Sequence, residues 1–255
     1  MPITPHANPA PHNTPSEHPS GQAVHRFGLN TQGRDFIIGD IHGYFQALRR
    51  SIRRIKFNRS CDRLFSVGDL VDRGPSSNDV IAWINQPWFH PIRGNHEQMA
   101  IECVMGCVDT GWYIRNGGAW FIDLPEARKR EIAKLFSSLP LAIEVESPGG
   151  RVGIVHAEAS CAWELFTDRI ANMDGPVAIS ALWSRKRFQS KDATPVGGWL
   201  QSMWDTRQSI RSGASATRST STPVRESGAP RLLVLDPREI YPSRGGVPDV
   251  MPKKI

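Results

Sequence analysis

The chain has 255 residues, of which 39% are hydrophobic and 22% charged, and its formal net charge is +6. Residues 1–184 hold 18 Lys and Arg against 19 Asp and Glu, whereas residues 185–255 hold 13 against 6. The excess positive charge therefore belongs to the last quarter, and the main part lacks the basic field that a nucleic-acid-binding domain needs.

Residues 1–32 are interpreted as a disordered leader, rich in Pro and His. Large apolar side chains are almost absent there, so the segment cannot bury enough surface to offset the entropy cost of ordering. It lacks the apolar core of a signal peptide, and no stretch of the chain approaches the roughly 20 apolar residues of a membrane span. The four cysteines form no C-x-x-C pair, which indicates reduced thiols. We therefore expect a cytoplasmic protein that binds neither nucleic acid nor membrane.

Strands and helices alternate from Arg34 onward. The expected strands are RDFIIGD, DRLFSVGD and WFHPIRGNHE, and the expected helices are YFQALRRSIRRIKF, SSNDVIAWIN and QMAIECVM. In the first helix, apolar residues recur with helical spacing at positions 45, 48, 52 and 55. This alternation predicts β-α-β units around a parallel sheet.

The middle of the chain has a different pattern. EARKREIAKLFSSL predicts an amphipathic helix that Pro125 opens, and LAIEVE and RVGIVHAE flank a Ser-Pro-Gly-Gly turn that predicts a β-hairpin. The fold class is thus expected to be mixed α/β, with parallel units followed by antiparallel pairing. Residues 189–255 are rich in Ser, Thr, Arg and Pro, and only RLLVLD predicts a strand there. This atypical segment is expected to be poorly ordered in part.

Polar clusters interrupt the apolar runs at four places: GDIHG (39–43), GDLVDRGP (68–75), GNHE (94–97) and VHAE (155–158). Ligands of open α/β sheets bind beyond the carboxyl ends of the strands, so the four clusters are expected to meet in one crevice. They supply carboxylate, imidazole and amide oxygen donors, which suit Mn²⁺, Fe²⁺ or Zn²⁺. The candidate metal ligands are Asp40, His42, Asp69, Asn95 and His156.

Three of these clusters match the signatures G-D-x-H-G, G-D-x-V-D-R-G and G-N-H-E, uninterrupted and in order. The chain thus resembles the phosphoprotein phosphatase branch of the metallophosphoesterases over about residues 33–188. NQPWFHPIRGNHEQM, NGGAWF and LPLAIEVE are similar to the small bacterial and phage-type protein phosphatases of this branch. The resemblance implies a catalytic domain at residues 33–188, built as a central β-sandwich flanked by helices.

The resemblance also implies a site for two divalent metal ions, with Mn²⁺ as the leading candidate and Fe or Zn as alternatives. The first ion would be bound by Asp40, His42 and Asp69. The second would share Asp69 and add Asn95 and His156. A water activated by the ions would attack phosphorus in line.

The catalytic roles implied by the resemblance fall on four residues. His96 would protonate the leaving alkoxide and Asp72 would hold it in position. Arg73 would bind phosphate oxygens with its planar donor fork, and Arg185 is a second candidate for that task.

Neighbouring residues receive structural interpretations. Glu97 is expected to serve the start of a helix or to support a site residue, without acid–base chemistry. The tryptophans are expected to form core or groove walls: Trp83, Trp88, Trp120 and Trp183.

The sequence departs from the family in one respect. Members of the family carry one more metal-binding histidine, usually in a G-H-T turn, but no histidine follows His156 in this chain. One explanation is that a reading-frame shift or a gene-level replacement changed the C-terminal quarter. The other is a divergent C-terminus, with water in place of the missing ligand.

The expected function is metal-dependent hydrolysis of phosphoserine or phosphothreonine in proteins, with phosphotyrosine as a further substrate class. One alternative is a hydrolase of the diadenosine tetraphosphate type, because such enzymes share these motifs. Another is a non-catalytic regulatory protein that binds metal or phosphate and has lost turnover along with its last ligand.

Overall fold

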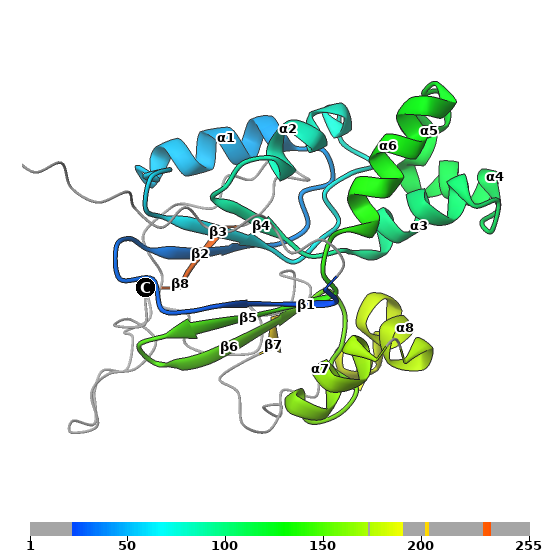
Figure 1. The fold of residues 1–255 in the computed structure, drawn as a ribbon. Coiled ribbons are helices and arrows are strands. Elements are labelled where there is room, and N and C mark those ends of the chain that lie inside the picture. Colours follow the sequence, from blue (N-terminus) through cyan, green and yellow to red (C-terminus); the bar gives the residue numbers. More distant parts are fainter. Residues whose placement is uncertain (1–21, 173, 191–201, 204–231, 236–255) are drawn as a thin grey trace, which may run out of the picture.

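The computed structural model describes residues 22–172, 174–190, 202–203 and 232–235. Two four-stranded sheets pack face to face, and helices cover the outer face of each sheet (Figure 1). The strand orders are β4-β3-β2-β8 and β1-β5-β6-β7. The expected β-sandwich flanked by helices is confirmed.

The bounds of the elements are as follows. The strands are β1 (Val24–Phe27), β2 (Asp35–Ile38), β3 (Arg63–Ser66), β4 (Phe89–Pro91), β5 (Ala142–Ser147), β6 (Gly150–Val155), β7 (Ser202–Met203) and β8 (Leu232–Leu235). The helices are α1 (Phe45–Arg54), α2 (Val80–Ile84), α3 (Asn95–Val104), α4 (Thr110–Tyr113), α5 (Ala119–Ile122), α6 (Glu126–Ser137), α7 (Trp163–Ala171), α8 (Gly175–Trp183) and α9 (Lys186–Ser190). A 3₁₀ turn at Ser77–Asp79 precedes α2, and a π-helical turn at Ile114–Gly118 joins α4 to α5. None of the described helices is long and apolar enough to cross a membrane.

The first sheet contains the predicted parallel units. Strands β2, β3 and β4 pair in parallel, with α1 and α2 as the crossovers. The predicted strand in RLLVLD is β8, which pairs antiparallel with β2. Apart from Gln189, Ser190, β7 and β8, the C-terminal segment 189–255 lies outside the described residues, as do residues 1–21 of the leader.

The second sheet contains the predicted hairpin, β5 and β6, and a strand that the sequence did not reveal. Strand β1 pairs in parallel with β5, with Val24 opposite Ala142. The expectation of a disordered leader up to residue 32 is therefore wrong for this strand. Four residues are too short for a periodic signal, and the partner of β1 lies far away in the sequence.

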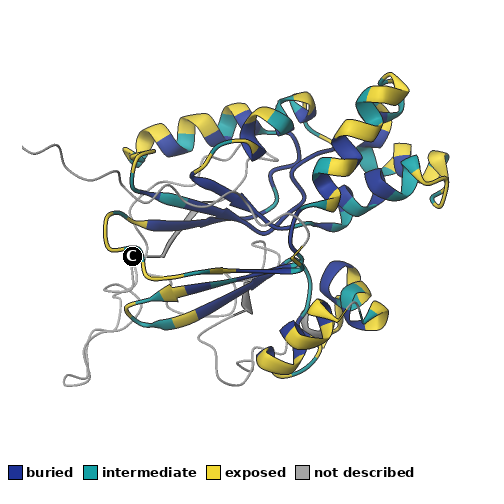
Figure 2. Cartoon of the chain, viewed as in Figure 1, coloured by how far each residue is buried: buried dark blue, intermediate teal, exposed yellow. Residues whose placement is uncertain are grey.

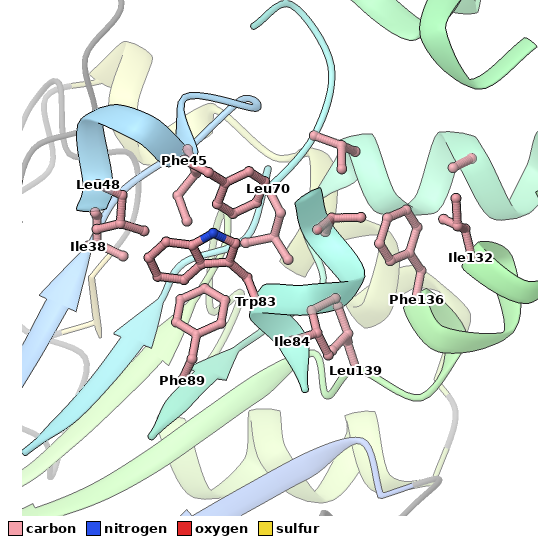
Figure 3. Close-up of a cluster of buried hydrophobic side chains, with 14 of the residues drawn as sticks. Ile38, Phe45, Leu48, Leu70, Trp83, Ile84, Phe89, Ile132, Phe136 and Leu139 are labelled. Atoms are coloured by element: carbon pink, nitrogen blue, oxygen red, sulfur yellow. The ribbon is translucent and has the colours of Figure 1, made fainter. Parts of the chain in front are cut away.

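The largest cluster of buried apolar side chains packs the first sheet against α1, α2, α3 and α6. Phe36 and Ile38 of β2 belong to it, whereas Ile37 belongs to the cluster between the sheets, because successive side chains of a strand point to opposite faces. Figure 3 shows Trp83 against Phe45 and Phe89, with ring centroids 5.4 and 5.6 Å away. The interpretation of Trp83 as a core residue is confirmed.

A second cluster lies between the two sheets and holds them together. Its buried members come from the strands of both sheets and the residues directly after them: Ile37, Phe65, Val67, Ile92, Ile143, Val145, Val152 and Ile154. A third cluster packs α7 and α8 under the second sheet around Trp163. In Figure 2 the facing surfaces of the sheets are accordingly dark with buried residues, whereas exposed residues line the outer faces of the helices.

Replacing Phe65 by Ala should lower the free energy of unfolding by about 3–5 kcal/mol, because the ring is buried between the sheets and leaves a cavity. Urea denaturation followed by circular dichroism would measure this change. Leu165→Ala is the matched control, since that side chain is 46% exposed. An equally small effect of both substitutions would contradict the packing of the two sheets on this cluster.

Candidate metal centre

Three loops and the first residue of a helix bring the candidate ligands to one edge of the sandwich. The loop after β2 carries Asp40 and His42, and the loop after β3 carries Asp69. Asn95 begins α3, and His156 directly follows β6 of the second sheet. The predicted convergence of the four polar clusters is thus seen in the fold.

The backbone around the site is held in unusual conformations. His42, Asp69, Asp72 and Arg73 have φ values of 44, 49, 71 and 64°, a region that side chains rarely adopt. Gly94 approaches Asp69 so closely that a Cβ atom would overlap the backbone nitrogen and the carboxylate of Asp69. Strained residues of this kind cluster at functional sites, where surrounding contacts hold them in place.

Asp69 lies at the centre of the cluster. Its carboxylate is 3.7 Å from Nε2 of His42, 3.8 Å from Nε2 of His96 and 3.5 Å from Nε2 of His156. Within the described ranges, two groups have ligand atoms that all lie within 4.8 Å of one another, and both contain Asp69. The groups are His42, Asp69 and His96, and Asp40, Asp69 and His156.

The rings of two histidines are oriented by backbone carbonyls. Nδ1 of His42 lies 3.0 Å from the carbonyl oxygen of Val71, and Nδ1 of His156 lies 2.7 Å from that of Val67. When Nδ1 donates its proton there, Nε2 keeps a lone pair that faces Asp69. Metal-binding histidines are held in the same way.

The amide of Asn95 lies against His156 and Asp69. Its oxygen lies 2.9 Å from Nε2 of His156, and acceptor faces acceptor when the proton of that ring is on Nδ1. A rotated amide would instead donate to Asp69 and His156 at 2.9–3.3 Å. The inward oxygen, two imidazole nitrogens and a shared carboxylate are donors that a divalent transition-metal ion accepts, so the residues present fit such an ion.

The electrostatics of the cluster centre on Asp69. Burial opposes its charged form, but the three imidazoles keep the pKa of Asp69 below its ordinary value. Burial lowers the pKa of His42 to about 4 despite the nearby Asp69 carboxylate, so this ring is neutral at pH 7. Burial also opposes protonation of His96 and His156, but Asp69 and a second nearby aspartate raise the pKa of each. The cluster thus stabilises positive charge beside Asp69.

A buried acid–imidazole pair adjoins the cluster. Oδ2 of Asp72 lies 2.6 Å from Nδ1 of His96, and both side chains are almost completely buried. The other oxygen, Oδ1, accepts a hydrogen bond from Nε1 of Trp120 at 2.6 Å and a longer one from the hydroxyl of Tyr113 at 3.4 Å. Neither partner is evident from the sequence, because no local pattern around Tyr113 and Trp120 indicates where the hydroxyl and the indole point.

The two arginines singled out from the sequence have different surroundings. Nη1 of Arg73 lies 2.7 Å from Nε2 of His42, and Nη2 lies 3.0 Å from Nε2 of His96. Arg185 is exposed, and no contact recorded within the described ranges joins its side chain to the cluster. It follows Ser184, whose hydroxyl donates to Glu158. The end of α8 is thereby tied to the loop that begins at His156.

Glu97 binds the backbone at Asp69, Leu70 and Gly94, and no contact recorded for it in the described part of the chain indicates acid–base catalysis. Its buried carboxylate accepts hydrogen bonds from the backbone N–H groups of Asp69, Leu70 and Gly94 at 2.8–2.9 Å. Burial and the nearby Asp69 raise the pKa of Glu97 to about 7, while the backbone donors favour its charged form. This agrees with the interpretation of Glu97 as a supporting residue.

Comparisons with known proteins agree with this geometry. Serine/threonine-protein phosphatase 2 of Escherichia coli K12 is 37% identical over 157 residues, 60% of this chain and 69% of that protein. Serine/threonine-protein phosphatase 1 of Salmonella typhimurium is 35% identical over 61% of this chain and 70% of its own length. A symmetrical bis(5'-nucleosyl)-tetraphosphatase of Chromobacterium violaceum is 41% identical, but over only 24% of this chain and 23% of that protein. The family model described as calcineurin-like phosphoesterase matches residues 36–210. The chain belongs to the calcineurin-like phosphoesterase family.

Proposed function

We propose that this protein hydrolyses phosphoserine and phosphothreonine side chains of proteins in a metal-dependent reaction. The observation that carries the proposal is the sharing of Asp69 by two groups of ligand atoms beside the buried Asp72–His96 pair. This chain aligns with 69% and 70% of the lengths of two serine/threonine-protein phosphatases. The similarity supports a phosphoprotein as the substrate. Residues 33–188, extended by β1, would form the catalytic unit.

We assign one ion to Asp40, His42 and Asp69 and a second to Asp69, Asn95 and His156. His96 lies near the first group, but its Nδ1 faces the carboxylate of Asp72 instead of a backbone carbonyl. Because the Asp72 carboxylate holds this ring at Nδ1, as in an acid–base pair, we assign His96 to proton transfer. The mixed oxygen and nitrogen donors favour Mn²⁺, with Fe²⁺ or Zn²⁺ as alternatives.

Divalent ions bound here supply Lewis acidity and an activated water for attack on phosphorus. His96 donates its Nε2 proton to the departing ester oxygen, and Asp72 keeps the ring in place from the opposite nitrogen. Arg73 places its two terminal nitrogens against Nε2 of His42 and Nε2 of His96, and a guanidinium at this position suits the oxygens of a phosphate ester. Arg185 is a second phosphate ligand in this proposal.

Activity assays distinguish this function from the two alternatives, a dinucleoside tetraphosphatase and a non-catalytic regulatory protein. Preference for a dinucleoside tetraphosphate over a phosphopeptide would favour the tetraphosphatase function, although the similarity to the Chromobacterium protein is confined to 64 residues. Failure to hydrolyse a generic aryl phosphate with or without Mn²⁺ would favour a non-catalytic regulatory protein. The four free cysteines agree with a reducing compartment, and we propose that the enzyme acts in the cytoplasm.

Replacing His96 by Asn should leave metal binding largely intact and lower turnover about 10²- to 10⁴-fold, the usual range for a general acid. The loss should shrink for p-nitrophenyl phosphate, because a good leaving group needs little protonation. Steady-state kinetics with alkyl and aryl phosphate esters would measure both effects. Equal losses on the two kinds of ester would remove His96 from this role.

The two ions should bind in separate steps, because the second site has the neutral amide of Asn95 where the first site has the carboxylate of Asp40. The final histidine of the family is absent from the sequence after residue 156, and the loss of even a supporting group weakens metal affinity about 10- to 100-fold. Activity should therefore require excess Mn²⁺. Isothermal titration of the metal-free protein would resolve the steps.

Asn95→Ala is the matched variant for this titration and should abolish only the weaker step. Two tight, equivalent ions in the unmodified protein would mean that another residue completes the second site.

A further inference from the structure

The Asp72 carboxylate accepts hydrogen bonds from two side chains in addition to its contact with His96. Oδ2 meets Nδ1 of His96, while Oδ1 accepts from the indole of Trp120 at 2.6 Å and from Tyr113 at 3.4 Å. Asp72 has no exposed surface. A buried carboxylate needs such donors, and hydrogen bonds to a charged group are stronger than those between neutral groups.

The donors come from a segment that wraps the turn at Asp72 and Arg73. Tyr113 ends α4 and Trp120 lies in α5, and the π-helical turn between them contains Gly117 with φ of 104°. The carbonyl of Gly117 faces the backbone nitrogen of Arg73 at 3.5 Å, and a Cβ on Gly117 would come within 2.5 Å of that nitrogen. The segment therefore touches both the carboxylate and the backbone of this turn.

The turn itself depends on outside contacts. Asp72 and Arg73 both have positive φ, which is unfavourable for residues other than glycine. The backbone N–H of Asp72 donates to Oγ of Ser77 at 2.9 Å, which fixes one side of the residue. The indole of Trp120 fixes the other side, at the carboxylate.

We propose that Trp120 is a positioning residue for the hydrolysis of phosphate esters, an inference that rests on the proposed function. Its indole N–H holds Oδ1 of Asp72, so that Oδ2 contacts Nδ1 of His96 and Nε2 of this ring lies beside Nη2 of Arg73, the proposed phosphate ligand. When the P–O bond breaks, its electrons stay on the leaving oxygen, which takes the Nε2 proton. Water supplies the new P–O bond, and the proton that it loses restores His96.

Trp120→Phe keeps an aromatic ring and removes the indole donor together with part of the ring volume. We expect a loss in kcat of about 10- to 100-fold on a phosphoserine peptide, corresponding to one hydrogen bond to a charged group. The loss on p-nitrophenyl phosphate should be several times smaller. Trp83→Phe is the matched control, because no hydrogen-bond partner for the buried Trp83 indole is found within the described ranges. It should leave both activities unchanged.

Tyr113→Phe removes the longer contact to the same oxygen and should give the same substrate pattern with a smaller loss. This second variant keeps the test decisive if Trp120→Phe does not fold. Equal losses on the peptide and the aryl ester, in whichever variant folds, would show a merely structural role and overturn the inference.

A double-mutant cycle tests whether Trp120 acts through His96. In a His96→Asn background, Trp120→Phe should cause no further loss on the phosphopeptide, because residues that act as a unit are not additive. Fully additive losses would overturn the inference.

One readout does not need turnover. The Nδ1–H proton of His96, held in a short charge-assisted hydrogen bond, should give a far-downfield proton NMR signal that His96→Asn abolishes. Trp120→Phe should shift or broaden this signal, and an unchanged signal would overturn the inference. If the unmodified protein hydrolysed neither ester, the proposed function would fail, while this measurement would still decide the role of Trp120.

Discussion

The buried charge of Asp69 is the constraint that organises this protein. Its carboxylate lies within 4 Å of the Nε2 atoms of His42, His96 and His156, each supplied by a different segment of the chain. An isolated carboxylate at this depth would cost several kcal/mol, so it must be compensated by positive charge. The imidazoles of His96 and His156 contribute to that compensation, and a divalent ion in the same place would add to it. The loops are therefore stable together around Asp69 in a way that none would be alone.

The two sheets each contribute part of this arrangement. Asp69 follows a strand of the first sheet, and His156 follows a strand of the second, with its Nδ1 2.7 Å from the carbonyl of Val67. The apolar cluster between the sheets thus sets the position of His156 relative to Asp69. Close packing makes this distance insensitive to small fluctuations, and a metal site built across two sheets depends on that rigidity.

Residues that do not face the candidate metal site, such as Glu97 and Trp120, also hold its loops in position. Glu97 ties three backbone N–H groups from two loops to one carboxylate, which stabilises the left-handed backbone at Asp69. The indole of Trp120 similarly donates a hydrogen bond to the carboxylate of Asp72, which lies further along the loop that carries Asp69. Ligand strength and proton transfer both respond to such partners, so substitutions beneath the site should affect chemistry as well as stability.

The sequence by itself determined the parallel units, the hairpin and the candidate ligands Asp40, His42, Asp69, Asn95 and His156, because strand periodicity and glycine-flanked polar turns are local signals. Only the tertiary structure decided the place of β1 and β8, since a four-residue strand acquires its meaning from a partner distant in the chain. It also decided that the Trp120 indole reaches Asp72. The direction of a buried side chain depends on packing between elements, which no local pattern encodes.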